Sequence, residues 1–241
     1  LPALARWHAV MPLGGTSNHF RLKTLRNLGG WDAFNVTEDA DLGVRLARRH
    51  LRTATSTSFT LEDAPDRLRP WLGQRTRWLK GWMQTFMVHN RRPRSLLKDL
   101  GLAKFLLFEL TILSMLLAPL LHIAFLPMAL WLVLDGFGGV ANPTAWSMAC
   151  LLMLGLGFAV TIFTNIEGLR RTGQRRFQLF QLLLPLYWLL ISWAAVRALC
   201  EFVRRPFHWF KTPHQASSAF ATSASADRSG NQSEAPTLSV Q

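Results

Sequence analysis

Two adjacent carboxylates, Glu38 and Asp39, are the first candidates for chemistry in this 241-residue sequence. They follow Thr37 and open a predicted helix that runs from Glu38 to about His50. The dipole at a helix start favours ionised carboxylates, and an ionised carboxylate can take a proton from a hydroxyl nucleophile. Acidic residues behind a threonine are also typical of a helix cap with no catalytic role. The motif alone leaves both interpretations open.

A helix predicted from Trp71 to His89 places tryptophans beside arginines. At about 100° per residue, one face would carry Trp71, Gln74, Trp78, Gly81, Trp82 and Thr85, with Arg75 and Arg77 at its edges. Indole rings pack against the C–H faces of sugars, and a guanidinium can hold a departing diphosphate. The same residue types are typical of a helix at a membrane surface. A sugar platform and an interfacial helix are both compatible with the pattern.

Glycines, prolines and apolar spacing predict the elements that would position these groups. Residues 1–15 read as a short strand running into a glycine turn, so we expect the chain to begin inside a domain. A helix over 18–28 should end at Gly29-Gly30, and the Thr- and Ser-rich stretch 52–61 reads as a strand. Asp63-Ala64-Pro65 opens a further helical stretch, with a kink or fresh start at Pro70. The pattern indicates an α/β domain over residues 1–92.

The apolar residues indicate a membrane protein. The chain is 49% hydrophobic with net charge +13, and the lysines and arginines flank apolar blocks in the way that the positive-inside rule describes. This distribution, and the lack of a nucleic-acid motif, exclude a nucleic-acid partner. After an amphipathic interfacial segment at 94–102, the blocks 105–134, 145–165 and 177–203 predict about four spans, the first block forming a hairpin. Residues 93–203 would form the membrane region, and residues 204–241 a cytosolic basic motif and disordered tail.

Short motifs in residues 10–90 resemble, in order and spacing, the C-terminal half of processive family 2 glycosyltransferases of the bacterial cellulose-synthase-like branch. They are Gly14-Gly15-Thr16-Ser17-Asn18-His19-Phe20-Arg21, Gly29-Gly30-Trp31-Asp32, Asn35 to Gly43 around Thr37-Glu38-Asp39, Glu62-Asp63-Ala64-Pro65, and Gln74-Arg75-Thr76-Arg77-Trp78. The resemblance implies the C-terminal part of a GT-A type domain followed by an α-helical transmembrane bundle.

The resemblance also implies a role for each site residue. Asp39 matches the catalytic base and Glu38 a supporting carboxylate. The acceptor and the donor diphosphate would be held by Gln74, Arg75, Arg77 and Trp78. The loop beside the acceptor would be Gly15, Thr16, Ser17 and Asn18. The expected enzyme is an inverting hexosyltransferase that uses a UDP-sugar to extend a β-linked polysaccharide.

Part of such an enzyme is not found in this sequence. No Asp-x-Asp motif after a strand precedes Asp39, so the ligands of the expected Mg²⁺ or Mn²⁺ would lie in a missing N-terminal half or a partner subunit. Alone, the chain should be inactive. We expect it in the bacterial inner membrane, multi-pass, with its catalytic side and its C-terminus in the cytosol. The alternatives are an inactive membrane scaffold for a polysaccharide synthase and, less in keeping with the sequence, a transporter subunit.

Overall fold

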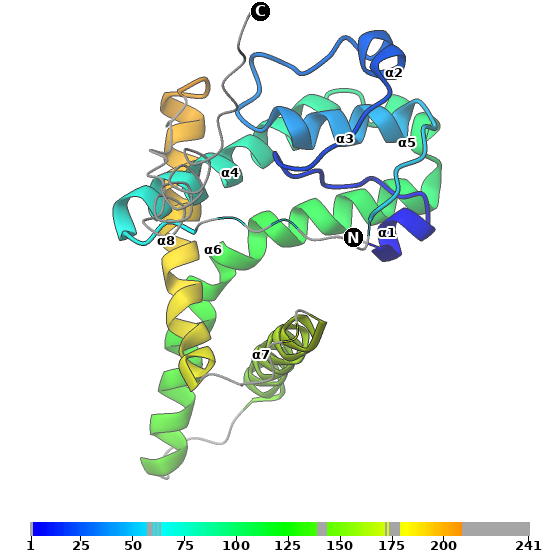
Figure 1. Cartoon of the computed structure of the whole chain (residues 1–241). Helices are drawn as coiled ribbons and strands as arrows, with labels where there is room; N and C mark the ends of the chain where they lie inside the picture. Colours follow the sequence, from blue (N-terminus) through cyan, green and yellow to red (C-terminus); the bar gives the residue numbers. More distant parts are fainter. Residues whose placement is uncertain are drawn as a thin grey trace, which may run out of the picture.

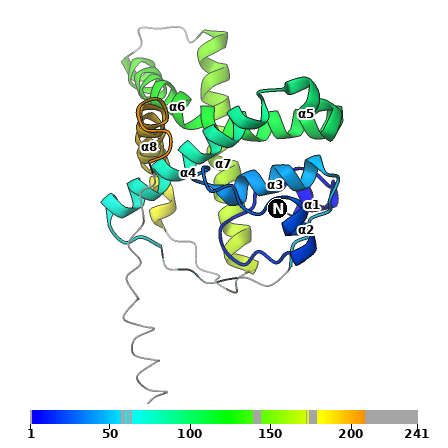
Figure 2. The same cartoon turned by 90° about the horizontal axis from the view of Figure 1, so that it is seen from above.

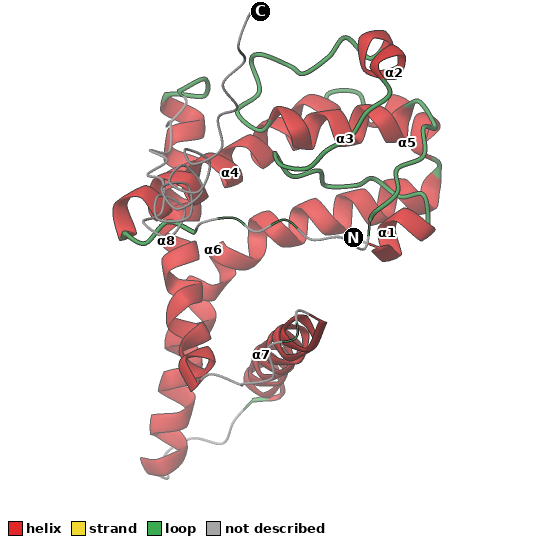
Figure 3. Cartoon of the chain, in the orientation of Figure 1, coloured by secondary structure: helices red, strands yellow, loops and turns green. Residues whose placement is uncertain are grey.

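The structure is a computed structural model that describes residues 2–56, 60, 62, 64–138, 144–171, 173 and 179–208. These residues form helices joined by loops (Figure 3). The helices are α1 (Pro2–Arg6), α2 (Leu22–Asn27), α3 (Glu38–Arg48), α4 (Leu68–His89), α5 (Pro93–Leu100), α6 (Leu102–Gly138), α7 (Ala145–Arg171), the 3₁₀ helix η1 (Leu179–Leu183) and α8 (Leu184–Arg204). Residues 209–241, with the predicted disordered tail, lie outside the described part.

The described residues contain no strand, so the prediction of an α/β domain is wrong for this part of the chain. Residues 9–14 and 51–56 run without regular structure, and no ladder of backbone hydrogen bonds joins either stretch to a neighbour. A strand is stabilised by hydrogen bonds to an adjacent strand, so its propensity alone does not produce one. Residues 57–59 and 61 of the predicted strand are not described.

The core of the N-terminal part lies between α3, α4, α5 and the first half of α6. Its buried members include Val10, Val44, Leu79, Met83, Leu96 and Phe108. The extended stretch that carries Val10 passes over α3 at Gly43, where an added Cβ would lie 2.1 Å from the Met11 carbonyl oxygen. Glycine is therefore required at residue 43, and this contact fixes residues 9–14 on α3.

Several predicted helix boundaries are confirmed. Helix α2 ends just before Gly29 and Gly30, which adopt left-handed φ angles of 82° and 71°. Helix α3 begins at Glu38 as expected, but the side chain of Thr37 makes no capping hydrogen bond. Pro70 neither kinks nor restarts α4, because it lies in the first turn, where its missing N–H needs no partner.

The predicted hairpin in the first apolar block is wrong. Helix α6 is one 37-residue helix that contains both Pro119 and Pro127. The sequence between these prolines offers only His122 as a polar side chain, so a turn there would leave backbone groups without partners in an apolar environment. Within the described residues, three helices are long and apolar enough to cross a membrane, over Leu102–Trp131, Ala145–Arg171 and Gln181–Arg204.

Helix α6 bends, so that its first half runs beside the N-terminal helices and its second half runs along α8 (Figure 1). Helix α8 is seen side-on in Figure 1 and end-on in Figure 2, whereas α7 shows the reverse, so these two helices cross at a steep angle. Helix α8 packs against α4, with Glu201 near its C-terminal end paired with Lys80 and Tyr187 near its start in contact with Trp71. If α6, α7 and α8 each crossed the membrane in turn, the start of α6 and the end of α8 would lie on opposite sides. In the structure both lie beside α4, and therefore on the same side.

This arrangement predicts the side of the membrane on which the end of α8 lies. In a protein with Cys150 and Cys200 replaced by serine, single cysteines at Arg91 and His208 should react with an impermeant maleimide from the same face. A cysteine at Thr144, beyond the far end of α6, should react from the other face. Labelling of intact cells and of inverted vesicles measures this, and opposite sidedness for residues 91 and 208 would contradict the packing of α8 on α4.

Candidate functional site

The start of α3 is positioned by close contact with α4. A Cβ placed on Gly81 would lie 2.3 Å from Thr37 Oγ1, so only glycine leaves room for the threonine. Next to this contact, Asn35 Nδ2 donates a hydrogen bond to Thr85 Oγ1 at 2.9 Å, and both side chains are buried. These contacts fix the carboxylates at the start of α3 relative to α4.

Gln84 connects the loop before α3 with the segment after α8. Its Oε1 accepts a hydrogen bond from the Val36 N–H at 3.2 Å, and its Nε2 donates one to the Pro206 carbonyl at 2.8 Å. One turn earlier in α4, Lys80 is only 1% exposed and donates to the Arg205 and His208 carbonyls. The same helix therefore holds both the candidate base and the end of the membrane region.

A hollow of about 540 Å³ opens at the start of α3. Its lining combines the predicted acceptor loop and the paired carboxylates with an indole ring: Gly15, Ser17, Asn18, Trp31, Glu38 and Asp39. The volume falls within the range of about 300–1,000 Å³ that small-molecule sites occupy. The structure thus brings together two predicted motifs that are about twenty positions apart in the sequence.

Asp39 is the half-buried carboxylate of this hollow. Its Oδ1 accepts the Ala40 N–H at 2.8 Å, and Oδ2 lies beside Gly15. Burial raises the pKa of Asp39, and the negative charge of Glu38 raises it further. The Ala40 hydrogen bond and the positive charge of Arg77 act in the opposite direction but do not cancel the rise. A raised pKa makes the ionised form of a carboxylate a stronger base, which suits it to accept a proton from a hydroxyl group.

The loop at residues 14–18 is held from a second direction. Thr16 Oγ1 donates a hydrogen bond to Glu62, and the hydroxyls of Ser17 and Thr60 lie 2.5 Å apart. Ser17 has a left-handed φ of 56°, which is uncommon for a non-glycine residue, and Asn18 Nδ2 donates to the Gly14 carbonyl. The predicted Gly-Thr-Ser-Asn and Glu-Asp-Ala-Pro motifs therefore meet in space.

The predicted platform on α4 is only partly formed. The Arg75 guanidinium lies 4.4 Å from the Trp78 ring centroid and 5.7 Å from that of Trp71, so it stacks between the two indoles. Neither Arg75 nor Trp78 lines the hollow, and neither does the half-buried Gln74. Arg77 is the member of this motif whose charge acts on Glu38 and Asp39.

The expectation that Gly81, Trp82 and Thr85 share one face with Trp78 in a sugar platform is wrong. Gly81 and Thr85 contact the loop before α3. Trp82 packs against the hydrophobic core and lines a small apolar gap with Phe108 and neighbouring residues of α6. A helical projection groups residues by their angle around the axis and takes no account of neighbouring elements. Here the loop before α3 covers one part of this face, and the core with α6 covers another.

Asp41 forms a buried ion-pair network behind the hollow. His89 Nε2 lies 2.8 Å from Asp41 Oδ1, and Arg45 Nε donates to Oδ2 at 2.6 Å. Arg48 extends the network to α5 by pairing with Asp99 at 2.7 Å. Burial acts to raise the pKa of Asp41, but the His89 hydrogen bond and the Arg45 charge outweigh it, so the pKa is lowered. Asp41 therefore joins α3 to α4, and its role is structural.

Trp31, Gln84 and His89 were not predicted as site or positioning residues. Trp31 follows Gly29-Gly30 in one of the motifs that resemble the family. Its position in that motif is the sequence signal that could have identified it. Gln84 and His89 lie on the predicted helix, but their partners Val36 and Asp41 are 48 residues away in sequence. Contacts over such a separation leave no local pattern to read.

A metal site needs several donor side chains close together. Among the residues that the structure describes, no group of three or more His, Cys, Asp or Glu side chains could hold a metal ion. The described residues therefore do not by themselves fit the divalent cation expected from the resemblance.

Comparison with known proteins gives a consistent family assignment. Residues 4–213 match the model of the family described as glycosyl transferase family group 2. The chain is 32% identical over 78 residues to the probable glycosyltransferase YdaM of Bacillus subtilis, covering 32% of this chain and 18% of that protein. It is 33% identical over 89 residues to the UDP-forming cellulose synthase catalytic subunit of Komagataeibacter sucrofermentans, and 35% over 85 residues to that of Komagataeibacter xylinus. Each of these two alignments covers 35% of this chain and 11% of the relative, and no solved structure matches the chain significantly.

The Asp41 network predicts a stability effect. Asp41→Asn should destabilise the protein by about 1–3 kcal/mol, because it removes the charge that pairs with His89 and Arg45 inside the fold. In the unchanged protein the lowered pKa supplies stability that is complete above the ordinary value of 3.8 and is lost as the pH falls below it. Thermal unfolding in detergent at neutral and acid pH measures both effects. An unchanged melting temperature at neutral pH would contradict the structural role.

The contact between Gly81 and Thr37 predicts a second effect. Gly81→Ala should cost about 1–3 kcal/mol, the usual range for overpacking, and should displace the start of α3. The matched control is Gly157→Ala in α7, where an added Cβ meets nothing within 4 Å and alanine favours the helix. Melting temperatures compare the two variants, and equal shifts would mean that Gly81 is not needed for packing.

Proposed function

This chain belongs to glycosyl transferase family group 2, and we propose that it supplies the acceptor side of the active site in a membrane-bound inverting hexosyltransferase. The proposed reaction transfers a hexose from a UDP-sugar to the growing end of a β-linked polysaccharide. The observation that supports it best is the hollow that Asp39 lines together with the loop at residues 14–18 and Trp31.

The proposed reaction is a single in-line displacement. Asp39 takes the proton of the acceptor hydroxyl as that oxygen forms a bond to C1 of the donor sugar. The bond from C1 to the diphosphate oxygen breaks at the same time, and UDP leaves with the electron pair. The configuration at C1 inverts from α to β, and no covalent sugar–enzyme intermediate is required. The half-buried position of Asp39 supports this role, because its raised pKa makes it a stronger base than a solvated aspartate.

Arg77 is the proposed cationic partner of the reaction. Its charge acts on both Glu38 and Asp39, so it lies close enough to the base to balance negative charge at the reacting centre. In this proposal Gln74 and Trp78 hold the acceptor or the diphosphate from the adjoining part of α4. Arg75 acts through Trp78, since its guanidinium stacks on that indole. Glu38 supports the site through its charge.

The nucleotide and metal sites are proposed to lie outside this chain. The chain spans only 18% of YdaM and 11% of each cellulose synthase subunit that it matches. A divalent cation would neutralise the leaving diphosphate, and the longer protein would supply its ligands.

The proposed location is the bacterial inner membrane, with the site on the cytosolic face, where nucleotide sugars are made. Three apolar helices long enough to cross a bilayer support membrane attachment. The packing of α8 on α4 keeps the membrane region and the site in one body.

The test is Asp39→Asn in the full-length protein in native membranes. Asparagine keeps the shape of the side chain but cannot take up the proton, so sugar transfer should fall by about 10² or more while UDP binding remains. The control is Asp66→Asn, the same chemical change at an exposed residue outside the hollow. Retention of more than about a tenth of the activity by the Asp39 variant would reject the base role.

The pH profile gives an independent readout on the same membranes. Activity of the unchanged enzyme should fall on acidification as Asp39 becomes protonated. Because burial raises its pKa, that fall should begin above the ordinary value of 3.8. Initial rates across the acid range measure this, and an acid limb below that value would show that Asp39 is not the titrating base.

A further inference from the structure

We propose that Trp31 is the residue on which the acceptor sugar stacks, so that its ring sets the face of the sugar presented to Asp39. This inference rests on the proposed function and adds a substrate contact that the sequence motifs did not assign. The ligand class is a neutral pyranose at the end of a β-linked chain.

The position of Trp31 is the first argument. It lines the same hollow as Asp39, together with Ser17, Asn18 and Glu38. A base must lie within hydrogen-bond distance of the hydroxyl that it deprotonates, so a sugar in this hollow that reaches Asp39 is the acceptor. Trp31 is therefore placed to contact the acceptor and not the departing nucleotide.

The exposure and orientation of the ring are the second argument. Trp31 is 50% exposed, although indole rings are highly buried on average. Phe20 contacts it edge to face, with ring centroids 6.0 Å apart and planes at 84°. Gly29 and Gly30 turn the chain just before it with left-handed φ angles. The ring thus has a defined orientation while much of its surface stays open.

The charges around the hollow are the third argument. Among the described residues, the lining contains two carboxylates, Glu38 and Asp39, and no lysine or arginine, although the charge of Arg77 acts on both carboxylates from outside the lining. This electrostatic environment disfavours a diphosphate and accepts a neutral sugar. Ser17, Asn18 and the carboxylates offer hydrogen bonds to sugar hydroxyls, whereas the indole offers a flat apolar surface to the C–H face. An apolar ring with a polar rim matches the two kinds of surface on a pyranose.

Trp31 is better suited to this contact than Trp78. The Arg75 guanidinium stacks on the Trp78 ring at 4.4 Å, so a face of that indole is already used. Trp78 also lies outside the hollow that contains Asp39. The two tryptophans therefore have different tasks, with Trp31 at the reacting end of the acceptor.

The test measures Michaelis constants in the full-length protein in membranes. The donor is whichever of UDP-glucose or UDP-N-acetylglucosamine supports turnover, and the acceptor is a short β-linked oligosaccharide of the same sugar. Trp31→Leu should raise the acceptor KM about 5- to 30-fold and leave the donor KM within about twofold, as expected for loss of one aromatic contact. Trp31→Phe, which keeps a smaller flat ring, should raise the acceptor KM only about 2- to 5-fold.

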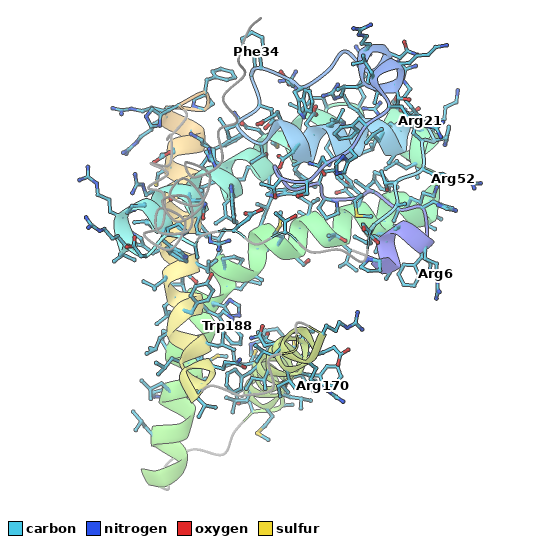
Figure 4. The ribbon with its side chains drawn as sticks, viewed as in Figure 1. Arg6, Arg21, Phe34, Arg52, Arg170 and Trp188 are labelled. Carbon is cyan, nitrogen blue, oxygen red and sulfur yellow. The ribbon has the colours of Figure 1, made fainter. Side chains whose placement is uncertain are left out.

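The matched control is Phe34→Leu. Phe34 lies on the loop before α3, is 76% exposed and does not line the hollow (Figure 4). Phe34→Leu should leave the donor KM and the acceptor KM unchanged. Equal rises in donor and acceptor KM for Trp31→Leu, or a rise of the same size for Phe34→Leu, would overturn the proposal. If Trp31→Leu does not accumulate, Trp31→Phe decides, and an unchanged acceptor KM in that variant overturns it.

Failure of this inference is distinguishable from failure of the proposed function. If Asp39→Asn abolishes transfer while the Trp31 variants behave like the unchanged enzyme, the base assignment stands and the stacking role is wrong. If Asp39→Asn transfers sugar normally, the hollow is not the reaction site and the Trp31 proposal falls with it.

Discussion

The arrangement of the candidate site depends on the close approach of α3 to α4 at Gly81. Because residue 81 has no side chain, Thr37 can lie directly against the helix, and the carboxylates that follow it are brought beside Arg77. The neighbouring contacts of Asn35 and Val36 with Thr85 and Gln84 hold the loop in place. The relative positions of the carboxylates on α3 and the Arg77 guanidinium on α4 thus follow from one close steric fit between the two helices.

Helix α4 also connects the site with the membrane region. Lys80 and Gln84 bind the carbonyl groups of the segment after α8, and Gln84 binds the loop before α3 with the other end of its amide. Movement of α8 relative to α4 must therefore disturb the contacts of Gln84 with the loop that precedes the candidate base. The candidate site and the apolar helices are therefore held together through α4.

The sequence was sufficient where local rules decide the structure. The Gly29-Gly30 terminus of α2, the start of α3 at Glu38 and the apolar helices follow from residue types within a few positions. It was insufficient where contacts between segments that are far apart in the sequence decide the structure. Strand propensity at 51–56 had no paired neighbour, and the amphipathic projection of α4 could not show that Trp82 would face α6. Asp39 and the Gly15 loop were found by motif, whereas the placement of Trp31 beside them required the fold.

The burial of Lys80 has a consequence for the order of assembly. Its ammonium group is shielded from water and lies 3.4 Å from Glu201 Oε2, a residue 121 positions later in the chain. At about 5–20 residues per second, roughly 6–24 s of synthesis separate the two residues. During that interval α4 cannot close this face, because an unpaired buried charge is too costly. The packing around Lys80 is therefore complete only after the last apolar helix has been made, so a ribosome that stalls earlier leaves this face of α4 uncovered.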